Sequence, residues 1–280
     1  MAKLNVEENL EQLKKTLREM GTVLIAYSGG VDSSFLAVTA HEVLGQNSLA
    51  VFASSPVAPP MEKEAAESLA HQFGLRFRII ESNEMANPDF VANPPERCYY
   101  CKRELFSELK PIALAEGLKW VADGTNADDL SDYRPGRKAS AEAGIRSPLL
   151  EVGLTKAEIR QLSRTQGLPT WDRPASPCLA SRIPYGIPVT AETLNKIAQG
   201  EKYLHNLGLR QVRLRHHGDI ARIELDQPDM AKIIKTDIRQ GIIEHFKALG
   251  YKYVTLDLTG YRTGSLNEVL GIANQEGKNG

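Results

Sequence analysis

The 280-residue sequence predicts an α/β protein with a doubly wound parallel sheet, followed by a smaller α+β domain. In the first half, short apolar runs of strand length alternate with segments whose apolar residues recur at helical spacing. A Pro-rich stretch follows, and beyond it two strand patterns succeed each other directly, which is typical of an α+β arrangement. We therefore expect domains over residues 1–168 and 190–280, joined by a connector over 169–189.

The first domain is expected to alternate helices with strands. Gly21, Gly74 and Gly167 follow three of its helical patterns, and glycine is the common residue where a helix ends. Thr155, with Glu158 three positions later, forms the capping-box pattern that begins a helix. The expected helices cover residues 5–20, 32–45, 61–73, 102–116 and 155–166, and the expected strands cover 23–27, 49–53, 77–80 and 120–122.

The second domain contains a hairpin with one apolar and one charged face, because side chains alternate along a strand. Guanidiniums gathered on one face suit bidentate capture of phosphate or carboxylate. A solvent-exposed face of an antiparallel sheet would carry the same residues, so both interpretations remain. The apolar face carries Val212, Leu214, Ile223 and Leu225, and the charged face carries Arg213, Arg215, Arg222 and Glu224. The hairpin strands are 211–216 and 220–225, with helices at 190–207 and 229–249, a strand at 252–257, and His216 and His217 as turn residues at the tip.

Composition limits the partners. With 34 basic and 35 acidic residues the net charge is near zero, so no global field attracts nucleic acid or a membrane. The N-terminal residues lack the apolar core of a secretion signal, and no run reaches the roughly 18 apolar residues of a membrane span. We therefore expect a cytoplasmic protein without a membrane partner, and the near-zero charge disfavours a nucleic-acid substrate. Its three cysteines then favour metal or sulfur chemistry over disulfides.

The most informative stretch is residues 23–34, where an apolar strand leads into a Ser-Gly-Gly turn and a helix. Glycines let the backbone bend and approach an anion, while the first N–H groups of the helix point at it. An acidic residue in the first helical turn can hold Mg²⁺, and serines can donate to phosphate oxygens. A Gly-rich turn without a ligand is the alternative. The residues expected to bind pyrophosphate are Ser28, Gly29, Gly30, Asp32, Ser33 and Ser34.

A second polar loop, Asp123 to Asp129, follows the strand expected at 120–122. Ligands of doubly wound sheets bind at the carboxyl ends of the strands, so this loop is a candidate for nucleotide or Mg²⁺ binding. Its candidate residues are Gly124, Asn126, Asp128 and Asp129. Glycine, asparagine and aspartate are also the usual residues of a solvated turn, and that interpretation remains equally open.

The cysteines suggest sulfur chemistry. Cys98 and Cys101 form a Cys-x-x-Cys pair just before the helix expected at 102–116, and Cys178 lies in the connector. Three thiolates are one short of a tetrahedral zinc set and fit a [4Fe–4S] cluster with one iron open to an external ligand. Unrelated small hydrophobic residues are the alternative. Near Cys178, Arg173 and Arg182 would favour the thiolate.

Together these motifs resemble the LarE family of ATP-dependent sulfur transferases, which act in nickel-pincer nucleotide synthesis. The resemblance covers nearly the whole chain. The turn at 28–34 is the PP-loop shared with tRNA thiolases, GMP synthetase and NAD synthetase, whereas the connector and hairpin motifs are more specific. The motifs are Ser28-Gly-Gly-Val-Asp-Ser-Ser34, Asp123-Gly-Thr-Asn-Ala-Asp128, Arg146-Ser-Pro-Leu-Leu-Glu151, Pro177-Cys-Leu-Ala-Ser-Arg182 and Val212-Arg-Leu-Arg-His-His-Gly-Asp219.

The resemblance implies a Rossmann-like PP-loop domain that uses ATP and Mg²⁺ and releases pyrophosphate and AMP. The implied substrate is pyridinium-3,5-biscarboxylic acid mononucleotide, whose carboxylates become thiocarboxylates. Its phosphate and carboxylates would suit Arg182, Arg213 and Arg215. The resemblance also implies a homo-hexamer and a nickel-insertion protein in the same pathway, and leaves the sulfide source unknown.

The family divides by mechanism, and several assignments stay open. Members with one cysteine surrender its sulfur, whereas members with the additional pair resemble cluster enzymes, as this chain does. Cys178 is then either a cluster ligand or a sacrificial donor. Glu201 and Glu224 could be metal ligands or surface charges. The alternative functions are a PP-loop tRNA thiolase, which would want an RNA-binding surface, and a non-catalytic nucleotide sensor.

Overall fold

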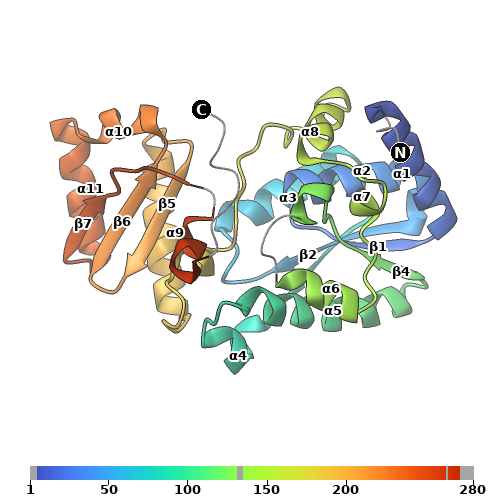
Figure 1. Cartoon of the computed structure of the whole chain (residues 1–280), viewed down its shortest axis with the longest axis horizontal. Coiled ribbons are helices and arrows are strands. Elements are labelled where there is room, and N and C mark those ends of the chain that lie inside the picture. The colour runs from blue at the N-terminus through green and yellow to red at the C-terminus, as the bar shows by residue number, and fades with distance from the viewer. Residues whose placement is uncertain (1–4, 131–134, 263, 272–280) are drawn as a thin grey trace. The chain divides into compact units, whose positions relative to one another are not determined.

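The computed structural model describes residues 5–130, 135–262 and 264–271. Within them the chain divides into two compact units, which are described separately here. Unit 1 contains residues 5–87 and 96–176, and unit 2 contains residues 88–95 and those from 177 onward (Figure 1). Over the described residues, no helix combines the length and the apolar character that a membrane crossing requires.

Unit 1 is built on a parallel four-stranded sheet, as predicted, and its strands lie in the order β3-β2-β1-β4. Strands β1 and β4 are parallel neighbours, so the turn after β1 and the loop after β4 leave the same edge of the sheet. The strands are β1 (Val23–Ala26), β2 (Ser48–Ser54), β3 (Phe77–Glu81) and β4 (Trp120–Ala122). The helices are α1 (Val6–Met20), α2 (Val31–Leu44), α3 (Pro60–Gln72), α5 (Arg97–Ala115), α6 (Gly136–Glu142), α7 (Pro148–Glu151) and α8 (Lys156–Thr165), with short 3-10 turns η1 (Gly45–Asn47), η2 (Glu84–Ala86) and η3 (Ala127–Leu130).

Helices pack on both faces of this sheet, so its inner strands carry apolar side chains on both sides. On β1, Val23 and Ile25 pack into the core under α1, α2, α3 and α8, while Leu24 packs against α5 and α6 on the opposite face. Figure 1 shows these two helical layers above and below the sheet. The capping box predicted for α8 is present, with Thr155 and Glu158 bonded reciprocally.

Unit 2 contains a mixed three-stranded sheet in the order β5-β6-β7, with β5 and β6 antiparallel and β6 and β7 parallel. Segment 88–95 belongs to this unit because Asn93 Nδ2 donates to the carbonyl oxygens of Pro184 and Ile187, both at 2.8 Å. The elements are α4 (Pro88–Val91), η4 (Leu179–Arg182), α9 (Ala191–Asn206), β5 (Val212–His217), β6 (Ile220–Leu225), α10 (Gln227–Ile233), α11 (Thr236–Ala248), β7 (Tyr253–Leu256) and η5 (Ser265–Leu270).

His216 and His217, predicted as turn residues, are the last two residues of β5 and pair with Ala221 and Ile220. Two predicted helices also differ from the structure. Helix α5 begins at Arg97 rather than Lys102, so Cys98 and Cys101 lie inside its first turns instead of before it. Its polar and aromatic start carries no apolar periodicity, which hid the true beginning. The single helix predicted over 229–249 is two helices, because the backbone of Lys235 is extended and interrupts the hydrogen-bond ladder.

Candidate active site

The turn between β1 and α2, called here the PP-loop (residues 28–34), is closely packed against α3. Gly29 has a φ of 72°, in the left-handed region that favours glycine. A Cβ on Gly29 would stand 3.1 Å from the Cβ of Ala66 on α3. Gly30 is the N-cap of α2, so the N–H groups that follow it are available to an anion at the helix terminus.

Hydroxyl groups define the shape of the PP-loop. Ser28 Oγ and Ser33 Oγ lie 2.9 Å apart, and the backbone N–H of Ser28 donates to Ser33 Oγ at 3.1 Å. Ser34 is fully buried, and its backbone N–H donates to the Gly30 carbonyl at 3.0 Å. Ser33 therefore closes the turn, whereas Ser34 lies beneath it.

Asp32, in the first turn of α2, pairs with a lysine that the sequence did not single out. Lys156 Nζ, from the first position of α8, lies 2.6 Å from Asp32 Oδ2. The second carboxylate oxygen, Oδ1, is buried and has no hydrogen-bond partner among the described residues. A carboxylate oxygen without a hydrogen-bond partner is the hard oxygen ligand that fits Mg²⁺ at this position.

An arginine of the connector holds the PP-loop from outside. Arg173 Nη1 donates to the Gly29 carbonyl at 3.2 Å, and Arg173 Nη2 lies 3.0 Å from a carboxylate oxygen of Glu62 on α3. The sequence suggested that Arg173 would act on Cys178. The structure shows its guanidinium on the PP-loop, within unit 1.

The loop after β4 contacts the PP-loop directly. A Cβ on Gly124 would stand 2.9 Å from the backbone nitrogen of Ser33, so only glycine fits between the two segments. The loop is not a solvated turn, because Asn126 and Asp129 are buried. Asp129 Oδ2 accepts from the Asn126 N–H at 3.0 Å, and Asn126 Oδ1 accepts from the Asp128 N–H at 2.9 Å. These side chains shape the loop that faces the PP-loop.

Asp123 at the end of β4 is a buried carboxylate, 3% exposed, with four donors. Lys102 Nζ and Ser140 Oγ donate to Oδ2, both at 3.0 Å, while the Thr125 N–H (3.1 Å) and Ser147 Oγ (2.8 Å) donate to Oδ1. Burial alone would raise the pKa of Asp123, but the Lys102 charge and these hydrogen bonds outweigh it and lower the pKa. Asp123 therefore carries a stable negative charge.

The three cysteines lie on two different elements. Cys98 and Cys101 are three residues apart on α5, which puts both on one face of the helix. Cys98 is exposed and Cys101 is half-buried. Cys178, also half-buried, is the N-cap of η4 in unit 2. In the described parts of the chain, no three or more His, Cys, Asp or Glu side chains group closely enough to hold a metal.

The charged face of the β5–β6 hairpin is buried. The register confirms the predicted faces, because Arg213 pairs with Glu224 across the strands and Arg215 pairs with Arg222. Glu224 is fully buried and Arg213 is 5% exposed, so this is not a solvent-exposed side of a sheet. Burial, together with the charges of Arg182 and Arg215, lowers the pKa of Arg213.

The two carboxylates suggested as metal ligands are occupied by guanidiniums. Glu201 accepts from Arg182, and Glu224 accepts from Arg215 and Arg222, at distances of 2.9 to 3.0 Å. Both carboxylates therefore belong to buried ion pairs and are not surface charges.

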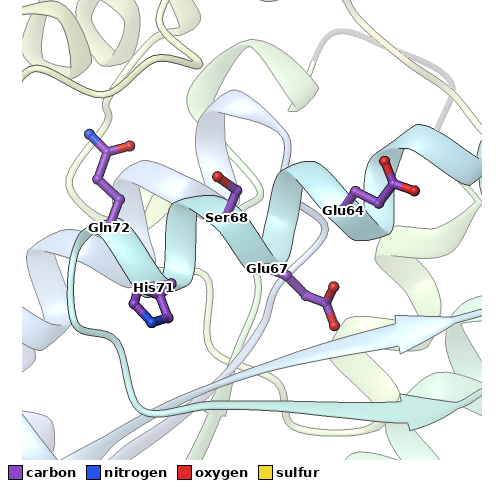
Figure 2. Close-up of a pocket in the computed structure, with 5 residues that line it drawn as sticks. All are labelled: Glu64, Glu67, Ser68, His71 and Gln72. Carbon is purple, nitrogen blue, oxygen red and sulfur yellow. The ribbon is translucent and has the colours of Figure 1, made fainter.

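An open pocket on unit 1 lies along α3 and is a different feature from the PP-loop. Figure 2 shows that its lining side chains all come from that one helix and project outward from it. They are Glu64, Glu67, Ser68, His71 and Gln72. Glu62 and Ala66, the α3 residues near the PP-loop, are not among them.

Comparison with known proteins gives the family. Residues 5–90 match the NAD synthase family. The pyridinium-3,5-bisthiocarboxylic acid mononucleotide synthase of Lactiplantibacillus plantarum is 37% identical over 259 residues, 92% of this chain and 93% of that protein. The chain belongs to the LarE family. An uncharacterized Synechocystis protein is 48% identical over 266 residues, 95% of this chain and 99% of its own. An uncharacterized Methanocaldococcus jannaschii protein is 31% identical over 259 residues, 91% and 98% of the two chains.

Membership of the LarE family makes this chain an ATP-dependent sulfurtransferase of the PP-loop class, as the motifs predicted. The PP-loop family implies ATP with Mg²⁺. Sequence reasoning missed Lys156, Lys102 and the Glu62–Arg173 pair. Each is a charged residue outside the recognised motifs whose partner is distant along the chain, and no local pattern identifies such partners.

Proposed function

We propose that this LarE protein adenylylates the carboxylates of pyridinium-3,5-biscarboxylic acid mononucleotide and converts them to thiocarboxylates. The observation that carries the proposal is the full-length similarity to the L. plantarum synthase, combined with a PP-loop shaped for an anion. We also propose, by family resemblance, a cytoplasmic homo-hexamer that works beside a nickel-insertion protein.

In the first step, a substrate carboxylate oxygen attacks the α-phosphorus of ATP, the bond to the β-phosphate oxygen breaks, and pyrophosphate leaves. The N–H groups after Gly30 stabilise its charge at the terminus of α2. Ser28 and Ser33 shape the turn around it. Asp32 would hold Mg²⁺, and Lys156 would turn its ammonium from Asp32 to the phosphates.

The loop after β4 positions the nucleotide beside the PP-loop. Gly124 permits the close approach to Ser33, while Asn126 and Asp129 keep the loop folded. We assign these residues to nucleotide binding through their backbone. Ser34 contributes by supporting the turn from beneath.

In the second step, a sulfur nucleophile attacks the carbonyl carbon of the acyl-adenylate, and AMP leaves with the bonding electron pair. We propose that Cys98, Cys101 and Cys178 together hold a [4Fe–4S] cluster, because paired thiols on one helical face are soft ligands. When bound, such a cluster supplies an iron that can present sulfide without consuming the protein. A sulfide donor must then restore one sulfur for each carboxylate converted.

The substrate's anionic groups are assigned to Arg213. Its guanidinium is buried, and burial together with the charges of Arg182 and Arg215 lowers its pKa, so a bound anion would stabilise its charge. The centroid of the Tyr261 ring lies 5.1 Å from the Arg213 guanidinium, within the range of a cation–π contact.

Pyrophosphate release tests the substrate. With MgATP under anaerobic conditions, we expect release that depends on the pyridinium mononucleotide and not on unfractionated tRNA. Release that depends on tRNA would instead identify a tRNA thiolase. If neither substrate causes pyrophosphate release, the result would favour a nucleotide sensor.

Iron and acid-labile sulfide content tests the sulfur step, on protein purified without oxygen. We expect about four irons per chain and their loss in Cys98→Ala, which should still adenylylate. Protein that stays iron-free after reconstitution would contradict the cluster and make Cys178 a sacrificial donor. Many turnovers by Cys98→Ala would contradict it as well.

A further inference from the structure

Two buried arginines of unit 2 hold the backbone of the segment that carries Cys178. Arg182 is 1% exposed, and its Nε and Nη2 donate to the two carboxylate oxygens of Glu201, each at 2.9 Å. The third nitrogen, Nη1, donates to the carbonyl oxygens of Pro177 and, at 3.1 Å, Cys178. One side of the guanidinium is therefore fixed by a buried carboxylate, and the other side donates hydrogen bonds to the backbone around Cys178.

Arg215 holds the same segment one turn further on. Its Nε and Nη2 donate to the two oxygens of Glu224, each at 3.0 Å, and its Nη1 donates to the Ser181 carbonyl at 2.7 Å. The Ser181 N–H in turn donates to the Cys178 carbonyl at 2.9 Å. Both ends of the short turn after Cys178 are thus tied to charged groups of β5, β6 and α9.

We propose that Arg182 and Arg215 are positioning residues that fix Cys178 for sulfur delivery, and that neither binds the anionic groups of the substrate. The inference rests on the proposed function, since it assigns roles within that reaction. Every guanidinium nitrogen of both residues already donates to a protein oxygen. Arg182 Nη2 and Arg215 Nη1 each have a second N–H, but bidentate binding of a phosphate would displace a buried carboxylate, carbonyl or hydroxyl oxygen from its donor, which is costly.

Arg182→Lys tests the proposal, because lysine keeps the charge but cannot bridge Glu201 and the two carbonyls as a planar guanidinium does. We expect an unchanged KM for the pyridinium mononucleotide in pyrophosphate release. Thiocarboxylate formed per pyrophosphate should fall by roughly a hundredfold, the effect of about 1 Å of misplacement. The rate at which iodoacetamide labels Cys178 in iron-free protein at fixed pH should also change.

Arg222→Gln is the matched control. Arg222 shares Glu224 with Arg215, at 2.9 Å, but its other ion pair is with Asp257 and not with the Cys178 segment. It should match the wild type in substrate KM, thiocarboxylate yield and labelling. Arg215→Lys should instead behave as Arg182→Lys does.

A second variant separates positioning from folding. Arg182→Met combined with Glu201→Leu removes both charges, leaves no unpaired buried ion and still deletes the carbonyl contacts. If it melts cooperatively, it should reproduce the altered labelling of Arg182→Lys. A raised substrate KM with unchanged labelling would overturn the proposal and make these arginines substrate ligands. If the wild type releases no pyrophosphate with this substrate, the proposed function fails, and the labelling rates alone decide the positioning role.

Discussion

Glycine positions in the PP-loop show how single residues determine the site. Gly29 and Gly21 have nearly the same φ, 72° and 73°, but only Gly29 is crowded, because a Cβ there would stand 3.1 Å from the Cβ of Ala66. A Cβ on Gly21 would meet nothing within 4 Å. The two glycines therefore share a positive φ and differ in packing.

Replacing each of these glycines by alanine distinguishes a loss of stability caused by backbone strain from a loss of ATP binding. Gly29→Ala and Gly21→Ala should both lose about 1–2 kcal/mol of unfolding free energy, because both take the left-handed conformation. Only Gly29→Ala should also lose ATP binding, since the new methyl group displaces the turn from α3. Titration calorimetry with MgATP would measure this. Equal ATP affinity in the two variants would contradict the anion-binding role of the turn.

Asp123 gives a prediction for pH. Its pKa is lowered in the folded protein, so it stabilises the fold above its unfolded pKa of about 3.9, and the stabilisation is lost as the pH falls through the lower folded value. Asp123→Asn should cost about 1.5–3 kcal/mol at neutral pH, with the difference from wild type shrinking below about pH 4.

Urea unfolding at several pH values measures the Asp123 effect. Asp219→Asn is the control, because Asp219 forms an exposed ion pair with Lys252 and should change little at any of these pH values. A difference between Asp123→Asn and wild type that stays constant in acid would refute the assignment.

Helix α8 links local sequence signals to the site. The capping box of Thr155 and Glu158 fixes where α8 begins, and this start places Lys156 against Asp32. The cap was recognisable from sequence because its partners are three residues apart. The ion pair was not, because it joins positions 124 residues apart.

Two N-cap replacements test this link. Thr155→Ala and Thr190→Ala each remove a side-chain cap, on α8 and α9 respectively, and should each cost about 1 kcal/mol of stability. Only Thr155→Ala should weaken MgATP binding, because only α8 carries Lys156. Thermal unfolding with and without MgATP would compare them, and an equal ligand-induced shift would count against a role for Lys156.

For the whole molecule, features that depend on the spacing of apolar residues along the chain were predictable. Contacts between residues far apart in the sequence were not. The parallel sheet, the hairpin faces and both loops were predictable from alternation and from strand ends. The pairing of Glu201 with Arg182 and of Glu224 with Arg215 was not, because a buried ion pair leaves no local pattern. Some charged residues that the sequence suggested as ligands therefore form ion pairs that hold the Cys178 segment, namely Arg182 with Glu201 and Arg215 with Glu224.

The assignment of a sulfurtransferase acting on the pyridinium mononucleotide is tested most directly by mass spectrometry of the substrate itself. The protein, kept anaerobic, would be incubated with MgATP, a sulfide donor and pyridinium-3,5-biscarboxylic acid mononucleotide. We predict that carboxylate oxygen is replaced by sulfur, with one AMP and one pyrophosphate formed for each replacement. A substrate recovered with its mass unchanged, although pyrophosphate is released, would contradict the account.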